Sequence, residues 1–253
     1  MDSTDSYLHC GLSKYRPVED VKRTIEAAGV SRAVLVQHLG EYDNTYIAGI
    51  VEREPDRFAG VCLVDHTAPS AESTLRSLLS NGPFRGVRLT ADTLREAPRL
   101  WVAAADIGAV IVYFAPDGIA GSAAALRSFL DARPGCRVVV THLGNPDARQ
   151  SPRFEAHRAL FQLAAYPEVF LQISGMEMFA SYPYEELYPL IAQAARTFGA
   201  SRLLWGSNYP VVGGLQDYCK ALNLLLGGKL PIPKEAISAV AGANARLLWF
   251  GVS

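Results

Sequence analysis

Short apolar runs recur along the whole chain and alternate with longer amphipathic stretches, and this alternation constrains the fold more than any other feature. Each run is rich in Val, Ile and Leu and is apolar almost without interruption. Strands buried on both faces have this composition, as in a parallel sheet covered by helices. The predicted strands are 6–9, 32–37, 58–65, 86–90, 109–114, 137–142, 169–174 and 202–207.

The stretches between these runs carry apolar residues at helical spacing, and the first begins with acidic residues and ends at glycine. Eight strand–helix units in 253 residues match the size of a closed barrel. A doubly wound open sheet is the rival, but no G-x-G-x-x-G pattern follows an early strand. We therefore expect one α/β domain over 1–253, a single (β/α)8 TIM-like barrel. The predicted helices are 18–29, 45–55, 71–82, 121–135, 154–167, 184–199 and 242–251, whereas 91–99 and 176–184 are expected as loops.

The charge balance limits the partners of this protein. The chain has 24 basic and 25 acidic residues, and no basic run is interleaved with aromatic residues. No apolar stretch approaches the roughly 20 residues of a membrane helix. We expect no nucleic-acid or membrane partner, and the sequence leaves a homo-oligomer open. The polar N-terminus is unlike a secretory signal, and the four scattered cysteines favour a reduced, cytoplasmic protein.

The histidines are concentrated where a barrel of this class would carry its chemistry. Active sites of such barrels lie at the C-terminal ends of the strands. Four of the five histidines, His9, His38, His66 and His142, end or follow a predicted strand. Strand alternation places Tyr7 on the same side as His9, facing the lumen. The histidines therefore mark one end of the barrel as the candidate site.

Arg88 is unusual because it lies within an apolar predicted strand. Burying an unpaired guanidinium is costly. Arg88 therefore either meets an anionic ligand or pairs with an internal acid such as Asp65, and we favour the ligand. Phe114 and Trp205, which also lie at strand ends, are interpreted as packing residues.

An ordered set of short motifs resembles the amidohydrolase-related family. The usual signatures of that family are H-x-H, G-V-R, D-H-x-G-x-P, K-x-S-G and W-G-[ST]-D-[WY]-P. The V-Y-F of strand five and the segment Q-H-L-G-E-Y-D-N (37–44) are most similar to its 2-pyrone-4,6-dicarboxylate lactonase branch. The matching motifs are D-x-x-x-H (5–9), G-V-R-L (86–89), V-T-H-L-G-N-P-D (140–147), I-S-G (173–175), W-G-S-N-Y-P (205–210) and N-A-R-L (244–247).

The resemblance implies roles for several of these residues. His9 and His142 would be the catalytic imidazoles. Arg88 would meet a substrate carboxylate, and Tyr113 would contact the substrate. The match runs through the whole chain, so the resemblance also implies the barrel fold.

The chain departs from the family pattern at three positions. Tyr7 replaces the first histidine of H-x-H, Gln172 replaces the strand-seven lysine, and Asn208 replaces the strand-eight aspartate, which binds metal or activates water in relatives. A metallohydrolase needs several imidazole and carboxylate ligands around one ion. We therefore expect no metal and no other cofactor. A rearranged metal site that recruits His38 or His66 beside the two remaining imidazoles stays open.

The same departures change the expected chemistry. Asn208 cannot accept a proton and so cannot be a general base, but its amide can donate to a developing oxyanion. The hydroxyls of Tyr7 and Tyr113 can donate in the same way. Two carboxylates on the expected loops, Glu177 and Asp92, remain candidates to replace the missing base.

Three functions fit these residues. The favoured one is a metal-independent hydrolase that opens a lactone or ester of a small carboxylated cyclic substrate, with His9 or His142 as base and Gln172 and His38 as further substrate contacts. A non-hydrolytic lyase (decarboxylase or dehydratase) or a cyclase is the first alternative, because stabilising an oxyanion needs no activated water. A catalytically silent ligand-binding barrel is the second alternative.

Overall fold

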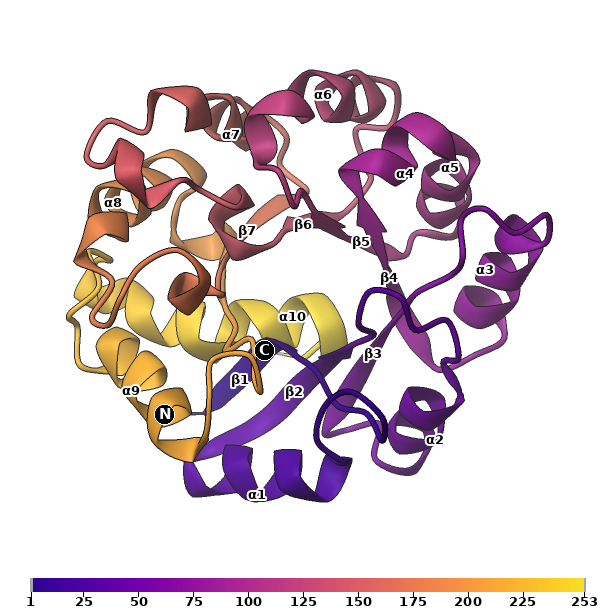
Figure 1. Cartoon of the computed structure of the whole chain (residues 1–253), viewed down its shortest axis with the longest axis horizontal. Helices are drawn as coiled ribbons and strands as arrows, with labels where there is room; N and C mark the ends of the chain where they lie inside the picture. The colour runs from indigo at the N-terminus through magenta and orange to yellow at the C-terminus, as the bar shows by residue number, and fades with distance from the viewer. Residues whose placement is uncertain (1, 253) are drawn as a thin grey trace.

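The computed structural model describes residues 2–252 and shows eight parallel strands hydrogen-bonded in sequential order from β1 to β8. The strands ring a common axis, and the helices lie outside them (Figure 1). A parallel bridge between Leu8 and Tyr209 joins the ends of the sheet, so the expected (β/α)8 barrel is confirmed. The strands are β1 (Ser3–Leu8), β2 (Val30–Val36), β3 (Phe58–Cys62), β4 (Phe84–Thr90), β5 (Val110–Phe114), β6 (Val138–Val140), β7 (Val169–Ile173) and β8 (Leu203–Trp205).

The helices cover the outer face of the sheet with their apolar sides (Figure 1). No helix within residues 2–252 is long and apolar enough to cross a membrane. The α-helices are α1 (Val18–Ala27), α2 (Thr45–Arg53), α3 (Ala71–Ser80), α4 (Ala91–Glu96), α5 (Pro98–Ile107), α6 (Ala123–Ala132), α7 (Ala159–Gln162), α8 (Tyr188–Phe198), α9 (Leu215–Leu226) and α10 (Asn244–Phe250).

Three segments differ from the sequence prediction. The expected loop 91–99 is α4 and the start of α5, because Thr90 and Thr93 form a reciprocal capping box and Pro98 opens the next helix. The expected helix 154–167 keeps only the short α7 between 3₁₀ turns, and Phe154 takes a left-handed φ of 44° where that helix was to begin. α9 was not predicted, although its apolar spacing is helical.

The last helix closes the N-terminal end of the barrel. α10 lies across the ring of strands in Figure 1, and its Trp249 packs among the lumen side chains. A Cβ on Gly86 would lie 2.5 Å from the carbonyl oxygen of Val110 and 3.1 Å from the Trp249 ring, so this strand residue must be small. The closed end leaves the C-terminal ends of the strands as the mouth. The lumen residues are Tyr7, Val34, Val36, Ala59, Val61, Val110, Val112, Val139, Leu204, Ala245 and Trp249.

A buried carboxylate fastens the seam between β1 and the segment after β8. Asp5 accepts hydrogen bonds from the backbone N–H of Tyr7 (3.1 Å) and of Ser207 (2.9 Å), and from the Tyr218 hydroxyl (2.9 Å). Burial raises the pKa of Asp5 to about 6. These bonds fix the 207–208 backbone beside Tyr7, whose carbonyl accepts from the N–H of Asn208.

Candidate active site

Three rings and a guanidinium form the floor of the mouth. The Tyr7 ring meets His9 edge-on at 5.1 Å between centroids and His142 at 4.7 Å. The guanidinium carbon of Arg88 lies 5.9 Å from the Tyr7 ring and 4.9 Å from the Phe114 ring. No more than 5% of any of the four floor residues, Tyr7, His9, Arg88 and His142, is exposed. Strand alternation placed Tyr7 and His9 correctly in the lumen.

A chain of hydrogen bonds assigns the tautomer of His142. The Gln172 amide donates to the carbonyl (3.0 Å) and hydroxyl (2.8 Å) of Ser6, so its oxygen accepts from the Ser174 hydroxyl at 3.2 Å. The Ser174 oxygen must then accept from His142 Nδ1, 2.9 Å away. His142 Nε2 is therefore unprotonated. Gln172, expected to contact substrate, is fully buried and ties β7 to β1 instead.

His9 is held in the same tautomer. Its Nδ1 lies 2.6 Å from the carbonyl oxygen of Val36 and donates to it, which leaves Nε2 without a proton. Burial, followed by the charge of Arg88, lowers the pKa of His9 well below its usual value. The same two causes lower the pKa of His142 to about 3. Both imidazoles are neutral acceptors at neutral pH.

Three polar atoms of the mouth have no hydrogen-bond partner within residues 2–252. They are the Tyr7 hydroxyl, His38 Nδ1 and Arg88 Nε. The only side-chain hydrogen bond of Arg88 within the same residues runs from Nη1 to the carbonyl of Gln37 at 3.3 Å. Asp65, the expected alternative partner, accepts from Thr67 instead. Buried polar groups are normally paired, so this cluster has the features of a binding site for an anionic group.

A residue that the sequence analysis missed covers this cluster. Tyr15, in the loop after β1, stacks on His9 with ring centroids 4.9 Å apart and planes 8° apart. Its edge meets His38 at 5.0 Å. A cavity of about 150 Å³ opens between this loop and the loop after β2, and His38 is among its lining residues. No motif marks Tyr15 in the sequence, because its contacts depend on the path of the loop.

Asn208 does not offer its amide hydrogens to the mouth as expected. Its Nδ2 donates to Glu177 Oε1 at 2.7 Å and lies 3.4 Å from the Met178 sulfur. Glu177 follows β7, in the segment expected as a loop, and burial raises its pKa. Gly175 allows this arrangement, because a Cβ there would lie 2.6 Å from His142 Nδ1. The structure thus pairs the altered strand-eight residue with a carboxylate.

Strained backbone marks the same end of the barrel. His142, Leu143 and Asn145 all have left-handed φ angles between 52° and 55°, and Asn208 has 57°. Residues other than glycine adopt this region rarely, and such strain is concentrated at functional sites. His142 and Asn208 are thus held by their surroundings in backbone conformations that their own preferences disfavour.

Tyr113 lies on the wrong face of its strand for substrate contact. Its ring packs against Trp101 in the layer between the sheet and the helices, and its hydroxyl donates to Ser122. The neighbouring Phe114 points into the mouth, where its ring meets His142 edge-on at 5.8 Å and lies beside Arg88. The structure therefore exchanges the predicted positions of the two side chains, with Tyr113 among the packing residues and Phe114 in the mouth.

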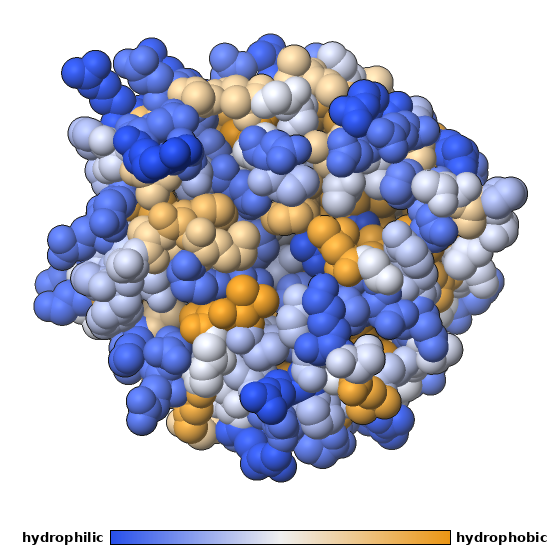
Figure 2. Space-filling view, viewed as in Figure 1, coloured by the Kyte–Doolittle hydropathy of each residue, from blue (hydrophilic) through white to orange (hydrophobic). Residues whose placement is uncertain are grey.

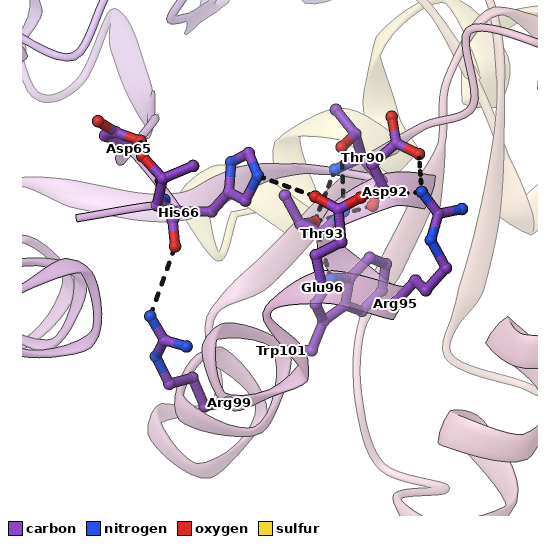
Figure 3. Close-up of polar contacts among 10 residues, drawn as sticks. Asp65, His66, Thr90, Asp92, Thr93, Arg95, Glu96, Arg99 and Trp101 are labelled. Carbon is purple, nitrogen blue, oxygen red and sulfur yellow. Dashed lines mark hydrogen bonds and ion pairs between the residues drawn. The ribbon is translucent and has the colours of Figure 1, made fainter. Parts of the chain in front are cut away.

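His66 and Asp92 lie in a separate polar cluster at the ends of β3 and β4 (Figure 3). His66 Nε2 is 3.4 Å from Glu96, and Arg95 pairs with both Asp92 and Glu96 at 2.9 Å. These groups are partly to largely exposed and satisfy one another. Neither His66 nor Asp92 joins the mouth residues.

The mouth residues do not fit a bound divalent metal. Within the part of the chain that the structure describes, no three His, Cys, Asp or Glu side chains gather in an arrangement that could hold an ion. The residue that lies between the two imidazoles is Tyr7, which brings a hydroxyl and not a carboxylate. The charge of Arg88, which lowers the pKa of both imidazoles, would also repel a cation.

The rim of the mouth carries apolar patches. Figure 2 shows them among hydrophilic residues around the hollowed middle of one barrel face. An apolar entrance above a few convergent polar groups is typical of small-molecule sites. Exposed apolar side chains in the loops after β1, β2, β7 and β8 are Leu12, Leu39, Tyr42, Met178, Tyr182 and Val211.

A closed (β/α)8 barrel with imidazoles, a tyrosine and an arginine at the C-terminal strand ends defines a barrel enzyme. The chain belongs to the amidohydrolase family, whose sequence pattern matches residues 11–251. It is thus a hydrolase by family.

Known proteins with assigned activities are similar to this chain. It is 29% identical over 248 residues to L-fucono-1,5-lactonase of Burkholderia ambifaria, covering 92% of this chain and 81% of that protein. It is 27% identical over 212 residues to 4-sulfomuconolactone hydrolase of Rhizobium radiobacter, covering 78% and 67%. Among solved structures, a Pseudomonas putida protein whose activity as a 2-pyrone-4,6-dicarboxylic acid hydrolase is a proposal has the same fold, with a TM-score of 0.79, 23% identity and coverage of 98% and 97%.

Proposed function

We propose that this enzyme hydrolyses a lactone of a small carboxylated ring, without a metal ion. The observation that carries the proposal is Arg88, which is buried and has no counter-ion within residues 2–252. Its guanidinium lies 5.9 Å from the ring centre of Tyr7, whose hydroxyl is also unpaired within the described residues. Two neighbouring side chains thus offer one charged donor and one neutral donor. A carboxylate and a lactone carbonyl on one ring would satisfy both.

The mouth residues have different roles in the proposed reaction, according to their chemistry. Arg88 binds the substrate carboxylate, with His38 as a further contact through its unpaired Nδ1. The Tyr7 hydroxyl donates to the carbonyl oxygen and stabilises the negative charge that grows there during attack by water. The bare Nε2 atoms of His9 and His142 accept hydrogen bonds from the water and orient it. Tyr15, which stacks on His9, covers the ring of the substrate.

The comparisons support lactone chemistry. Both curated relatives act on lactones by name, and both are similar to this chain over most of its length. The chemistry that stabilises an oxyanion would also suit a lyase, so the test must separate ring opening from loss of carbon dioxide or water.

The decisive experiment is a panel of five- and six-membered lactones, each with and without a ring carboxylate, assayed in ¹⁸O-labelled water. We expect turnover of carboxylated members and one labelled oxygen in each hydroxy-acid product. Release of carbon dioxide, or a product without label, would assign the enzyme to the lyases. Tight binding of carboxylated rings with no turnover would instead identify a silent binding barrel.

The metal-free part of the proposal has its own measurement. Purified protein is dialysed against a chelator, analysed for zinc and manganese, and assayed on the best lactone. Full activity at a metal content far below one ion per chain is expected. One ion per chain whose removal abolishes turnover would contradict metal independence and leave ring opening untouched.

A further inference from the structure

The enzyme carries one carboxylate at the place where its base is missing. Glu177 follows β7 and is partly buried, and it forms no ion pair within residues 2–252. Two other acids, Asp92 and Asp5, are committed elsewhere. Asp92 is paired with Arg95 in the exposed cluster of Figure 3. Asp5 accepts three hydrogen bonds in the β1–β8 seam.

We propose that Glu177 is the general base of the hydrolysis and that Asn208 is its positioning residue. This inference rests on the proposed lactonase function. Asn208 stands where the family motif has an aspartate, and its Nδ2 lies 2.7 Å from Glu177 Oε1. In this chain the carboxylate thus stands in the segment after β7 instead of the segment after β8, and the Asn208 amide hydrogen-bonds to it there.

The local geometry is built for this contact. The Met176–Met178 turn begins at Gly175, which has a φ of 62° and lies against His142. A side chain on Gly175 would collide with the imidazole, so glycine is what lets the turn sit directly over the histidine. Asn208 meets the turn from the segment after the neighbouring strand, β8, in its own left-handed conformation. The start of the turn therefore lies against His142, and the Glu177 carboxylate within the turn meets the Asn208 amide.

The imidazoles are weaker candidates for the base than the sequence suggested. The pKa of His142 is lowered to about 3 and that of His9 well below its usual value, because both are buried beside Arg88. A group that binds protons so weakly is a poor general base at neutral pH. Burial acts in the opposite direction on Glu177 and raises its pKa, which strengthens it as a proton acceptor.

The proposed step conserves atoms and charge. The water oxygen bonds to the lactone carbonyl carbon while one water proton moves to the Glu177 carboxylate. The carbonyl carbon–ring oxygen bond then breaks, and the proton passes from Glu177 to the departing ring oxygen. The product is a hydroxy acid that loses its second water-derived proton to solvent, and Glu177 is again ionised.

The test is an exchange of the two side chains, assayed on a lactone that the wild type hydrolyses. Glu177→Gln should lower kcat about a thousandfold with little change in KM. Asn208→Asp alone should also be impaired, because two carboxylates then face each other at hydrogen-bond distance. The double variant Glu177→Gln/Asn208→Asp should recover about tenfold or more over Glu177→Gln, since it returns the carboxylate to β8.

Glu185→Gln is the matched control, because Glu185 is an exposed acid eight residues further along the same segment. It should keep wild-type kcat, and melting temperatures identify any variant that fails to fold. A Glu177→Gln enzyme with more than a third of wild-type kcat would overturn the inference, as would a folded double variant no faster than Glu177→Gln. A wild type that hydrolyses no lactone would overturn the proposed function itself, and the role of Glu177 would fall with it.

Discussion

Two buried arginines at opposite ends of the barrel show how differently one side chain can be used. Arg246, on α10 at the closed end, is 9% exposed, and Arg88, in the mouth, is 5% exposed. Arg246 donates to the backbone carbonyl of Asp2 and lies 3.5 Å from its carboxylate. Arg88 has one long bond to a carbonyl and an unpaired Nε. The protein neutralises one arginine itself and leaves the other for a ligand.

The difference separates stability from function. A buried charge without a partner costs free energy of folding, whereas a paired one loses stability when either partner is removed. Arg88 should therefore be dispensable for folding and essential for binding, and Arg246 the reverse. Substitutions at the two ends test this contrast directly.

The largest expected effect is at Arg88. Arg88→Met keeps the length of the side chain and removes the charge. We expect kcat/KM for a carboxylated lactone to fall by about a thousandfold, or about 4 kcal/mol, because the substrate carboxylate loses its charged partner. The melting temperature should hold or rise. A lower melting temperature with unchanged kcat/KM would show that Arg88 is a structural residue like Arg246.

The second effect compares two tyrosines. The Tyr7 hydroxyl is unpaired in the lumen, whereas the Tyr113 hydroxyl donates to Ser122 outside it. Tyr7→Phe should lower kcat about a hundredfold with little effect on the melting temperature, because a donor to the carbonyl oxygen is lost. Tyr113→Phe should keep kcat and cost about 1 kcal/mol of stability. Equal kcat in the two variants would contradict the assignment of Tyr7.

The third expected effect is a loss of stability at the closed end of the barrel, when Arg246 is replaced. Arg246→Met removes the bonds to Asp2 and should lower the free energy of unfolding by about 2 kcal/mol, since hydrogen bonds of charged groups contribute this much. Urea unfolding measures the change. The kcat of the folded fraction should match wild type, because α10 lies at the far end from the mouth. A loss of kcat without a loss of stability would break the contrast between the two ends.

Much of the barrel could be predicted from the sequence, because strands buried on both faces leave unbroken apolar runs. Those runs also explain one error. In the strand V-I-V-Y-F both faces are buried and no charged residue marks which one turns to the lumen, so the alternation could not tell Tyr113 from Phe114. β1 shows the opposite problem. It starts at Ser3 rather than at residue 6, and its polar residues Asp5 and Ser6 can be buried because they bond to partners about 200 residues away.

The site was predicted only as far as its residues lie on strands. Tyr7 and His9 follow from alternation, and Arg88 follows from the cost of burying a charge in an apolar strand. Asn208 was recognised as altered, but its contact with Glu177 joins two loops 31 residues apart. Tyr15 reaches His9 through the path of a loop that no periodicity describes. Loops have no repeat from which side-chain direction can be read, so their contacts required the structure.

The smallest expected effect is on the pKa of His142, which burial and the charge of Arg88 both lower. That charge helps to hold the pKa of His142 near 3, below the ordinary 6.5, so between about pH 3 and 6.5 the unfolded chain binds more protons than the folded one at this site. This site therefore makes stability rise with pH across that window.

A bound carboxylate neutralises Arg88 and should raise the pKa of His142 by about one unit, or about 1.4 kcal/mol. Ring resonances followed by NMR, with and without a non-hydrolysable ring carboxylate, measure the shift. The carboxylate should cause no such shift in Arg88→Met, because the charge it neutralises is gone; an equal shift in both proteins would mean that the anion binds elsewhere.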